Sequence, residues 1–141
     1  MRPAYNLLSA RLSADVVAAG FSALRPAHGN VLKHLSEQSS VSLRVADLAV
    51  RADMTPQSMG ELVDDLEARG YVERRPDPVD RRAKRIHLTD KGGAAAAAAE
   101  RAMRKVEEHL VAVLGDAEYR RLRATLLTVL DASETSRPPP G

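Results

Sequence analysis

Two helical sequence patterns that meet at a tight turn, followed at once by strand-like alternation, limit what this chain can fold into. The helical patterns occupy residues 45–70 and meet at residues 53–55. Thr55 is a favourable N-cap, Pro56 suits the first helical position, and Gly70 supplies a left-handed exit. The sequence therefore predicts a helix, a tight turn and a second helix.

The second of these helices has two different sides. Its apolar residues recur at intervals of three and four, which places them on one stripe: Met59, Leu62, Val63 and Leu66. The opposite side near the helix start is polar and carries Gln57, Ser58 and Glu61. We expect the stripe to pack in a core and the polar first turn to stay exposed.

After Gly70 the pattern changes to a period of two. Residues 71–74 and 85–88 are typical of two strands, and the residues between them include the turn formers Pro76, Asp77, Pro78 and Asp80. Four of the five residues from Arg81 to Arg85 are cationic. A helix fits the major groove of DNA, and arginines on a thin ribbon can enter the minor groove. This combination predicts binding to double-stranded DNA.

The run from Asp77 to Gly92 resembles the wing signature of the MarR family of bacterial winged-helix transcription regulators, which reads D-x-x-D-R-R, a strand, then L-T-x-x-G. Other parts resemble the family's second helix and its helix-to-strand corner: Gly20-Phe21, Leu24, Pro26, Val31-Leu32-x-x-Leu35 and Gly70-Tyr71-Val72. The resemblance extends roughly from Leu7 to Leu130.

The resemblance implies a mainly α fold with a small β wing. Residues 43–89 would form the winged helix-turn-helix lobe, and residues 1–37 and 90–132 the dimerisation helices of the same single domain, 1–132. The apolar spacing predicts four helices outside the lobe: one ended by Gly20, one over 26–37, a long alanine-rich one from a Thr89 cap to Leu114, and one over 117–130. Leu43 and its neighbours would add a short strand beside the hairpin. Residues 133–141 would be a disordered tail.

Composition excludes several classes of protein. The 141 residues suit one domain, and 44% apolar with 28% charged residues describes a soluble chain. No run approaches the roughly 20 apolar residues of a membrane span, and no signal peptide is evident, so we expect a cytoplasmic protein and no membrane partner. Because cysteine is absent, disulfides, thiolate metal sites and cysteine redox sensing are excluded.

No catalytic constellation is apparent. The histidines have no compact metal-ligand spacing, so we expect no metal and no cofactor. Gly92-Gly93 is interpreted as a turn into the long helix rather than a phosphate-binding loop. We therefore expect a protein that is not an enzyme.

Candidate DNA contacts in the recognition turn are Thr55, Gln57, Ser58 and Glu61, because glutamine can pair with adenine and hydroxyls serve bases or phosphates. Thr55 is explained equally well as a helix cap. Glu61 is either a cytosine-reading acceptor or a brake on non-specific binding. Candidate phosphate contacts are Arg44, Arg51, Arg74 and Arg75.

In the wing, the resemblance places Arg81 at the tip, where it would enter the minor groove. Arg82 either contacts DNA or binds Asp77 or Asp80 and holds the turn rigid. Lys84 and Arg85 would face the phosphates or the outer side of the strand. Basic charge gathered in this hairpin is the pattern expected for phosphate contact.

The acidic residues of the second helix favour a different function. They would repel phosphates, although Asp65 can pair with Arg69 four residues on. A winged helix that binds a protein partner and never touches DNA is therefore the competing hypothesis.

The terminal helices carry more apolar surface than a monomeric winged helix needs, and this indicates a homodimer. Two-fold symmetry implies a pseudo-palindromic operator with half-sites about 10 base pairs apart. We expect a repressor released by a small effector, because the family resemblance implies small phenolic or aromatic acid ligands. The candidate pocket residues are Tyr5, Arg11, His28 and Tyr119, for which packing in the core or on the surface is the alternative.

Overall fold

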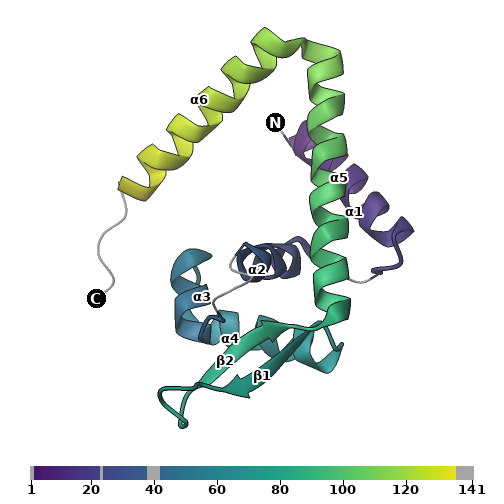
Figure 1. The fold of residues 1–141 in the computed structure, drawn as a ribbon. Coiled ribbons are helices and arrows are strands. Elements are labelled where there is room, and N and C mark those ends of the chain that lie inside the picture. Colours follow the sequence, from purple (N-terminus) through teal and green to yellow (C-terminus); the bar gives the residue numbers. More distant parts are fainter. Residues whose placement is uncertain (1, 23, 38–41, 136–141) are drawn as a thin grey trace. The chain divides into compact units, whose positions relative to one another are not determined.

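The computed structural model describes residues 2–22, 24–37 and 42–135. Those residues form helices and one two-stranded sheet (Figure 1), in the order α1 Arg2–Ala18, α2 Pro26–Ser36, α3 Val45–Arg51, α4 Pro56–Ala68, β1 Val72–Pro76, β2 Lys84–Leu88, α5 Asp90–Leu114 and α6 Asp116–Thr135. Contacts divide the chain into two compact units, residues 1–103 and 104–141. The predicted fold class, mainly α with a small β wing, is confirmed.

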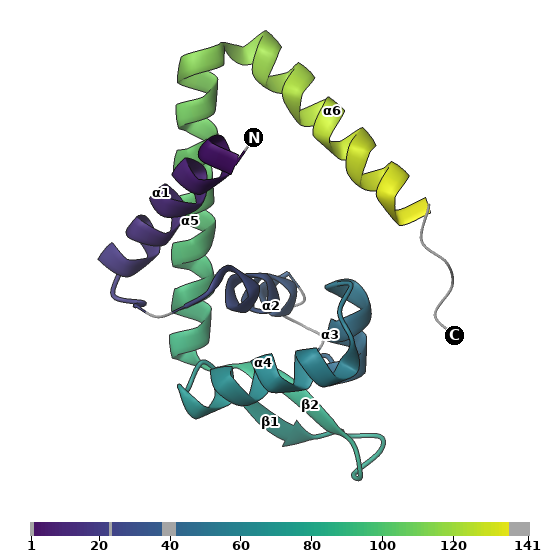
Figure 2. The same cartoon turned by 180° about the vertical axis from the view of Figure 1, so that it is seen from behind.

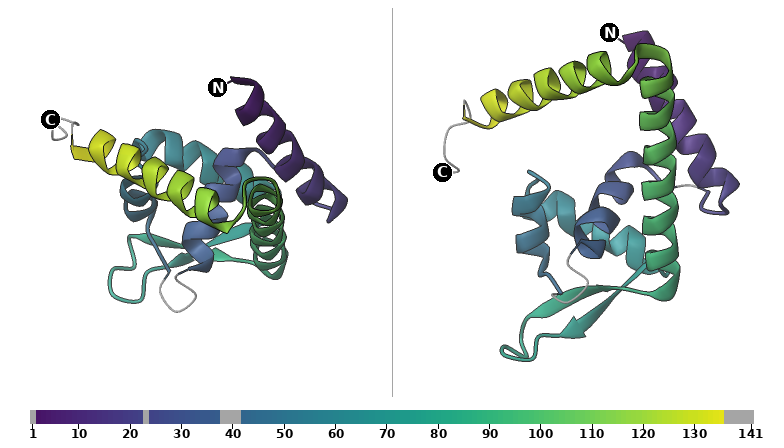
Figure 3. Two further views of the ribbon diagram at one scale, coloured as in Figure 1. Left: turned by 90° about the horizontal axis from the view of Figure 1, so that it is seen from above. Right: turned by 45° about the horizontal axis from the view of Figure 1, so that its top comes forward.

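The core of the first unit lies where α2 and α4 pack against the hairpin and α3 packs against α4 (Figures 1 and 3). The largest fully buried apolar side chains come from all of these elements, and they include Leu32, Leu48, Met59, Leu66 and Ile86. Full burial of one such side chain contributes about 1.5–3 kcal/mol. The predicted stripe of α4 is entirely buried in this core.

The helix-turn-helix forms for the local reasons that the sequence predicts. Thr55 Oγ1 accepts a hydrogen bond from the Ser58 backbone N–H at 3.1 Å, which caps α4. Asp53 has a φ of 54° in the turn before it, and Gly70 has a φ of 76° after α4. The Tyr71 N–H then donates to the Leu66 carbonyl at 2.9 Å and ends the helix.

The two strands pair antiparallel, with Arg74 opposite Ile86. The predicted strand beside the hairpin is present as a single bridge, in which the Ile86 N–H donates to the Leu43 carbonyl at 2.8 Å. Figure 2 shows the turn between β1 and β2 at the end of the hairpin opposite the start of α5. The segment from 77 to 83, together with Lys84 at the start of β2, therefore forms a projecting tip.

The start of α5 corrects one expectation. Thr89 Oγ1 accepts from the Gly92 N–H at 3.1 Å, as a cap should. Gly92 and Gly93, however, lie inside the first turn of α5 and not in a turn before it. The alanine run is helical, and Ala95 is fully buried, because small side chains permit close packing of this end of the helix.

The second unit contains the end of α5, a reversal at Gly115 with a φ of 80°, and α6. The last helix extends to Thr135, so residues 133–135 are helical and not part of a tail. The rest of the predicted tail, 136–141, lies outside the described residues. No helix in the described part of the chain is long and apolar enough to cross a membrane.

Candidate nucleic-acid interface

The first turn of α4 presents a polar surface. Thr55, Gln57 and Glu61 are exposed, and Ser58 is half-buried. The Thr55 hydroxyl donates to Ser58 Oγ at 3.0 Å, so these two side chains are also hydrogen-bonded to each other. Within the described residues, Gln57 and Glu61 have no side-chain partner and are available to a ligand.

The wing tip presents three cations. Arg81, Arg82 and Lys84 are exposed, and no carboxylate in the described part of the chain pairs with any of them. Only the backbone N–H of Arg82 is engaged, and it donates to Asp80 Oδ1 at 3.1 Å. The alternative role for the Arg82 side chain, binding Asp77 or Asp80, is therefore wrong in this structure.

Asp77 holds two other arginines instead. Its side chain is fully buried, and Oδ2 accepts from Arg44 Nη2 at 2.8 Å and from Arg85 Nε at 2.7 Å. The pKa of Asp77 lies well below its ordinary value, because the Val79 N–H and then the Arg85 and Arg44 guanidinium groups stabilise the carboxylate. Arg44 and Arg85 are thus engaged within the protein, in contrast to the phosphate contacts predicted for them.

Three of the four acidic side chains of α4 are also paired, and Glu61 is the exception among the described contacts. Arg74 binds Glu67 and, at 2.6 Å, Asp64, while Arg69 binds Asp65 at 2.8 Å. The last pair confirms the spacing argument from the sequence. Outside α4, Arg75 binds Glu73, two residues before it in β1.

Among the described residues, the predicted DNA contacts that are exposed and without a side-chain partner are Gln57 and Glu61 on α4, Arg51 on α3, and Arg81, Arg82 and Lys84 in the wing. Sequence reasoning missed the carboxylate partners of Arg44, Arg74, Arg75 and Arg85. The only local signal for the Asp77 cluster was an aspartate between two prolines in a cationic hairpin.

Of the predicted effector residues, Arg11 and His28 belong to the first unit and Tyr119 to the second. His28 is fully buried, and its two ring nitrogens face Arg25 and Asp65. Arg11 is exposed on α1, and the side chain of Tyr5 lies outside the described part of the chain.

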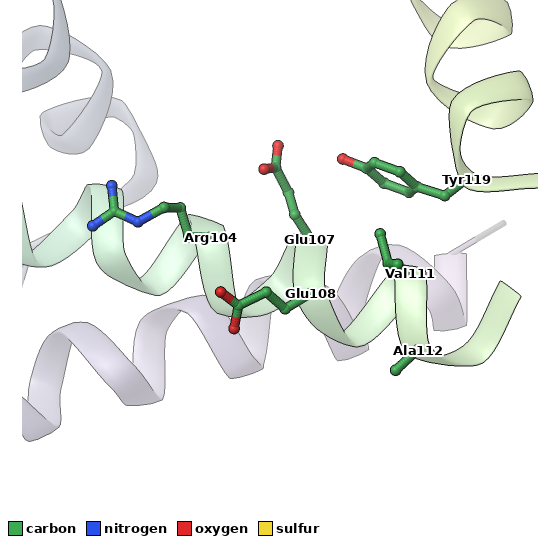
Figure 4. Close-up of a pocket in the computed structure, with 6 residues that line it drawn as sticks. All are labelled: Arg104, Glu107, Glu108, Val111, Ala112 and Tyr119. Carbon is green, nitrogen blue, oxygen red and sulfur yellow. The ribbon is translucent and has the colours of Figure 1, made fainter. Parts of the chain in front are cut away.

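Tyr119 does line an open hollow of about 430 Å³ within the second unit. The other residues around it come from the end of α5: Arg104, Glu107, Glu108, Val111 and Ala112. Figure 4 shows the Tyr119 hydroxyl directed toward Glu107, with Val111 beneath the ring. No group of three or more histidine and carboxylate side chains in the described residues could hold a metal ion.

Comparison with known proteins agrees with this geometry. A family model described as the MarR family matches residues 24–83, which include the helix-turn-helix and the first part of the wing. This segment belongs to the MarR family. The resemblance drawn from the wing signature is therefore confirmed.

A protein of Thauera aromatica, whose name assigns it to transcriptional regulation of the hcr operon, is 36% identical to this chain over 83 residues. The match covers 59% of this chain and 48% of that protein, so it spans about half the length of the relative. A MarR family protein of Mycobacterium tuberculosis is 27% identical, with a TM-score of 0.62 and coverage of 91% of this chain and 88% of the other.

The Staphylococcus aureus regulator MepR, solved in complex with DNA, has the same fold, with a TM-score of 0.77 and 22% identity over 93% of each chain. The Thauera and Staphylococcus relatives are transcription regulators and not enzymes, in agreement with the expectation for this chain. The winged-helix architecture is thus established both by the coordinates and by similarity.

Proposed function

We propose that this MarR-family chain is a sequence-specific DNA-binding transcription regulator that acts as a homodimeric repressor. Its partner would be double-stranded DNA with a pseudo-palindromic operator, and its location would be cytoplasmic because genomic DNA is the ligand. The front of α4 would enter the major groove, and the wing would contact the adjacent minor groove.

One observation carries this proposal. Around the hairpin, most arginines are paired with carboxylates, whereas Arg81, Arg82 and Lys84 at the tip are exposed and unpaired among the described residues. Three unpaired cations on a projecting loop repel one another, and an anionic ligand relieves that repulsion. A DNA duplex presents closely spaced phosphates that can pair with these cations, and beside them a minor groove that a side chain can enter.

The competing function, a winged helix that binds only a protein, drew its support from the acidic face of α4. Asp64 and Glu67 are paired with Arg74, and Asp65 is paired with Arg69. Because these charges are largely neutralised inside the protein, they offer less repulsion to a phosphate backbone. This observation favours the DNA-binding function.

Homodimerisation is supported by exposed apolar side chains on α6. Leu122, Leu126, Leu127 and Val129 are each at least about 39% exposed in the single chain. A second copy of α6 would bury this face. Light scattering after size exclusion should give twice the chain mass, and Leu126→Glu should shift the protein toward the monomer, whereas the exposed polar position Arg123→Glu should not.

Fluorescence anisotropy with a random duplex tests DNA binding directly. At low salt we expect binding that weakens with a log–log slope of about −0.9 per phosphate neutralised. Neutralising Arg81, Arg82 and Lys84 together should flatten that slope, while Arg101→Ala, which removes an exposed arginine of α5, should leave it unchanged. A protein-interaction module would not bind the duplex at any salt concentration.

Release by a small aromatic acid stays a prediction, and Tyr119 is the candidate residue that lines a hollow. A thermal-shift titration with benzoate and 4-hydroxybenzoate tests it. Protection that is lost in Tyr119→Leu would support the site, and no protection at millimolar acid would argue against it.

A further inference from the structure

The buried carboxylate of Asp77 joins three parts of the DNA-binding lobe. Oδ1 accepts from the backbone N–H groups of Val79 at 2.9 Å and Asp80 at 3.2 Å, which shapes the wing turn. Oδ2 accepts from Arg44 Nε at 3.0 Å and Nη2 at 2.8 Å and from Arg85 Nε at 2.7 Å. One oxygen therefore builds the turn, and the other binds two guanidinium groups.

These two guanidinium groups come from different elements. Arg44 is the N-cap of α3, where its own N–H donates to Asp47 Oδ2 at 3.0 Å. Arg85 lies in β2 and also donates to the Ser42 carbonyl at 2.8 Å. Through Asp77, the wing turn is thus tied to the segment that enters the helix-turn-helix. Charge-assisted hydrogen bonds of this kind hold geometry more firmly than neutral ones.

The same contacts remove two cations from the surface available to phosphates. Arg44 keeps 42% of its side chain exposed, so it lies close to solvent and is restrained by Asp77 rather than by burial. Without the carboxylate, Arg44 and Arg85 could both turn outward to a DNA backbone. Phosphate contacts of that kind raise affinity for every sequence alike.

We propose that Asp77 is a specificity-determining positioning residue, which withholds Arg44 and Arg85 from non-specific phosphate contact and fixes the wing against the start of α3. The inference rests on the proposed DNA-binding function. Asp77 touches no DNA in this scheme. It acts through the arginines that it holds and through the position of the tip that carries Arg81.

The variant Asp77→Asn separates the two oxygens. An asparagine can keep its carbonyl oxygen toward Val79 and Asp80, but its NH₂ group would face the two guanidinium groups and cannot bind them. The wing turn would keep its hydrogen bonds, whereas the contacts from Asp77 to Arg44 and Arg85, which we call the clamp, would be lost. We expect stronger binding to a random duplex, with a salt slope steeper by about 0.9 for each new phosphate contact.

Binding to the operator, obtained by selection from a randomised duplex pool, should change in the opposite sense. The ratio of operator affinity to random-duplex affinity should fall about tenfold or more, because a loosened wing no longer favours one groove geometry. A purely structural role for Asp77 would lower both affinities together. That outcome, or an unchanged ratio, would overturn the proposal.

Asp80→Asn is the matched control. It makes the same change of charge in the same turn, but among the described contacts the Asp80 side chain accepts only from the Arg82 N–H and binds no guanidinium group. The ratio of operator affinity to random-duplex affinity should be the same in Asp80→Asn as in the unmodified protein. An equal loss of specificity in both variants would mean that the charge of the hairpin matters and not the clamp, which contradicts the inference.

Two further measurements keep the outcomes distinct. Circular dichroism melting shows whether Asp77→Asn folds, and if it does not, Arg44→Met opens only the α3 side of the clamp and should still lower the ratio. Failure of the unmodified protein to bind any duplex at low salt would refute the proposed function itself. Failure of the ratio to change in a protein that binds DNA would refute only the role of Asp77.

Discussion

The Nε2 atom of His28 lies 3.0 Å from Oδ2 of Asp65, and this contact joins the start of α2 to α4. The other ring nitrogen, Nδ1, accepts from the Arg25 N–H at 3.1 Å. The ring is fully buried, and the neutral tautomer with its proton on Nε2 donates to Asp65 and leaves Nδ1 to accept from the Arg25 N–H. Arg25 Nη2, which lies 3.2 Å from Nε2, then has Asp65 Oδ2 at 3.7 Å as its acceptor. A second proton on Nδ1 would face the Arg25 N–H, and the hydrogen bond that caps α2 would be lost.

This contact predicts a loss of stability in mild acid. Burial, and next the Arg25 charge, lower the pKa of His28 in the folded protein below its ordinary value of 6.5, despite the opposing effect of Asp65. As pH falls through about 6.5, the unfolded chain takes up a proton at His28 before the folded protein does, so the free energy of unfolding decreases. Above that pH the stabilisation is fully present.

Urea denaturation between about pH 7.5 and about pH 5.5 measures the effect. His28→Gln can preserve both hydrogen bonds and does not titrate, so its unfolding free energy should depend less on pH. His87→Gln is the comparison: burial, and next the Arg75 charge, also lower the pKa of His87, so this variant should lose a separate part of the pH dependence. If His28→Gln retained the full pH dependence, the role assigned to His28 would be wrong.

The backbone around Gly92 leaves no room for a side chain. A Cβ atom there would lie 1.9 Å from the Tyr71 carbonyl oxygen, which already accepts from the Thr89 N–H at 3.1 Å. Gly92→Ala should therefore destabilise the protein by about 1–3 kcal/mol or more, through overpacking against backbone.

The neighbouring glycine provides the comparison. A Cβ at Gly93 meets nothing within 4 Å, and the residue is helical, so Gly93→Ala should stabilise by about 0.5–1 kcal/mol. Urea denaturation of both variants gives the two free energies. Similar effects of the same sign would contradict the close approach at Gly92.

Substitutions at Thr55 and Gln57 should affect different properties, the first the stability of the fold and the second the affinity for DNA. Thr55→Ala removes the cap of α4 and should cost about 1 kcal/mol of unfolding free energy, whereas Thr55→Ser should cost little. Gln57 is exposed and unpaired in the described part of the chain, so Gln57→Ala should change stability by less than about 0.5 kcal/mol. Operator binding should weaken in Gln57→Ala, and an unchanged affinity would remove Gln57 from the interface.

At the wing tip, we predict that Arg81 contributes to DNA binding and not to stability. Arg81→Ala should weaken operator binding by about 1–3 kcal/mol and leave the melting temperature unchanged, because the side chain is exposed and unpaired among the described residues. Gel shifts with the selected operator measure the affinity. Arg82→Ala is the adjacent comparison, since its backbone contact to Asp80 survives the substitution. Equal affinity of Arg81→Ala and the unmodified protein would refute minor-groove insertion.

Local sequence patterns determined most of the fold. The Thr55 cap, the Gly70 exit and the spacing of Asp65 and Arg69 each act over four residues or fewer, or at one backbone position, and all are present in the structure. The same is true of the alternating strands and the helical alanine run. The backbone geometry of a helix or a strand sets these relationships, so a single chain segment contains the information.

Tertiary structure decided which cations are available. Arg44 is paired with Asp77, 33 residues away, and Arg74 is paired with Asp64 and Glu67 on another element. No periodicity in the sequence distinguishes these arginines from Arg81, because an ion pair depends on which distant elements pack together and how deeply. The sequence shows that the wing is basic. Which carboxylate pairs with each arginine is set only when α3, α4 and the hairpin pack into one core.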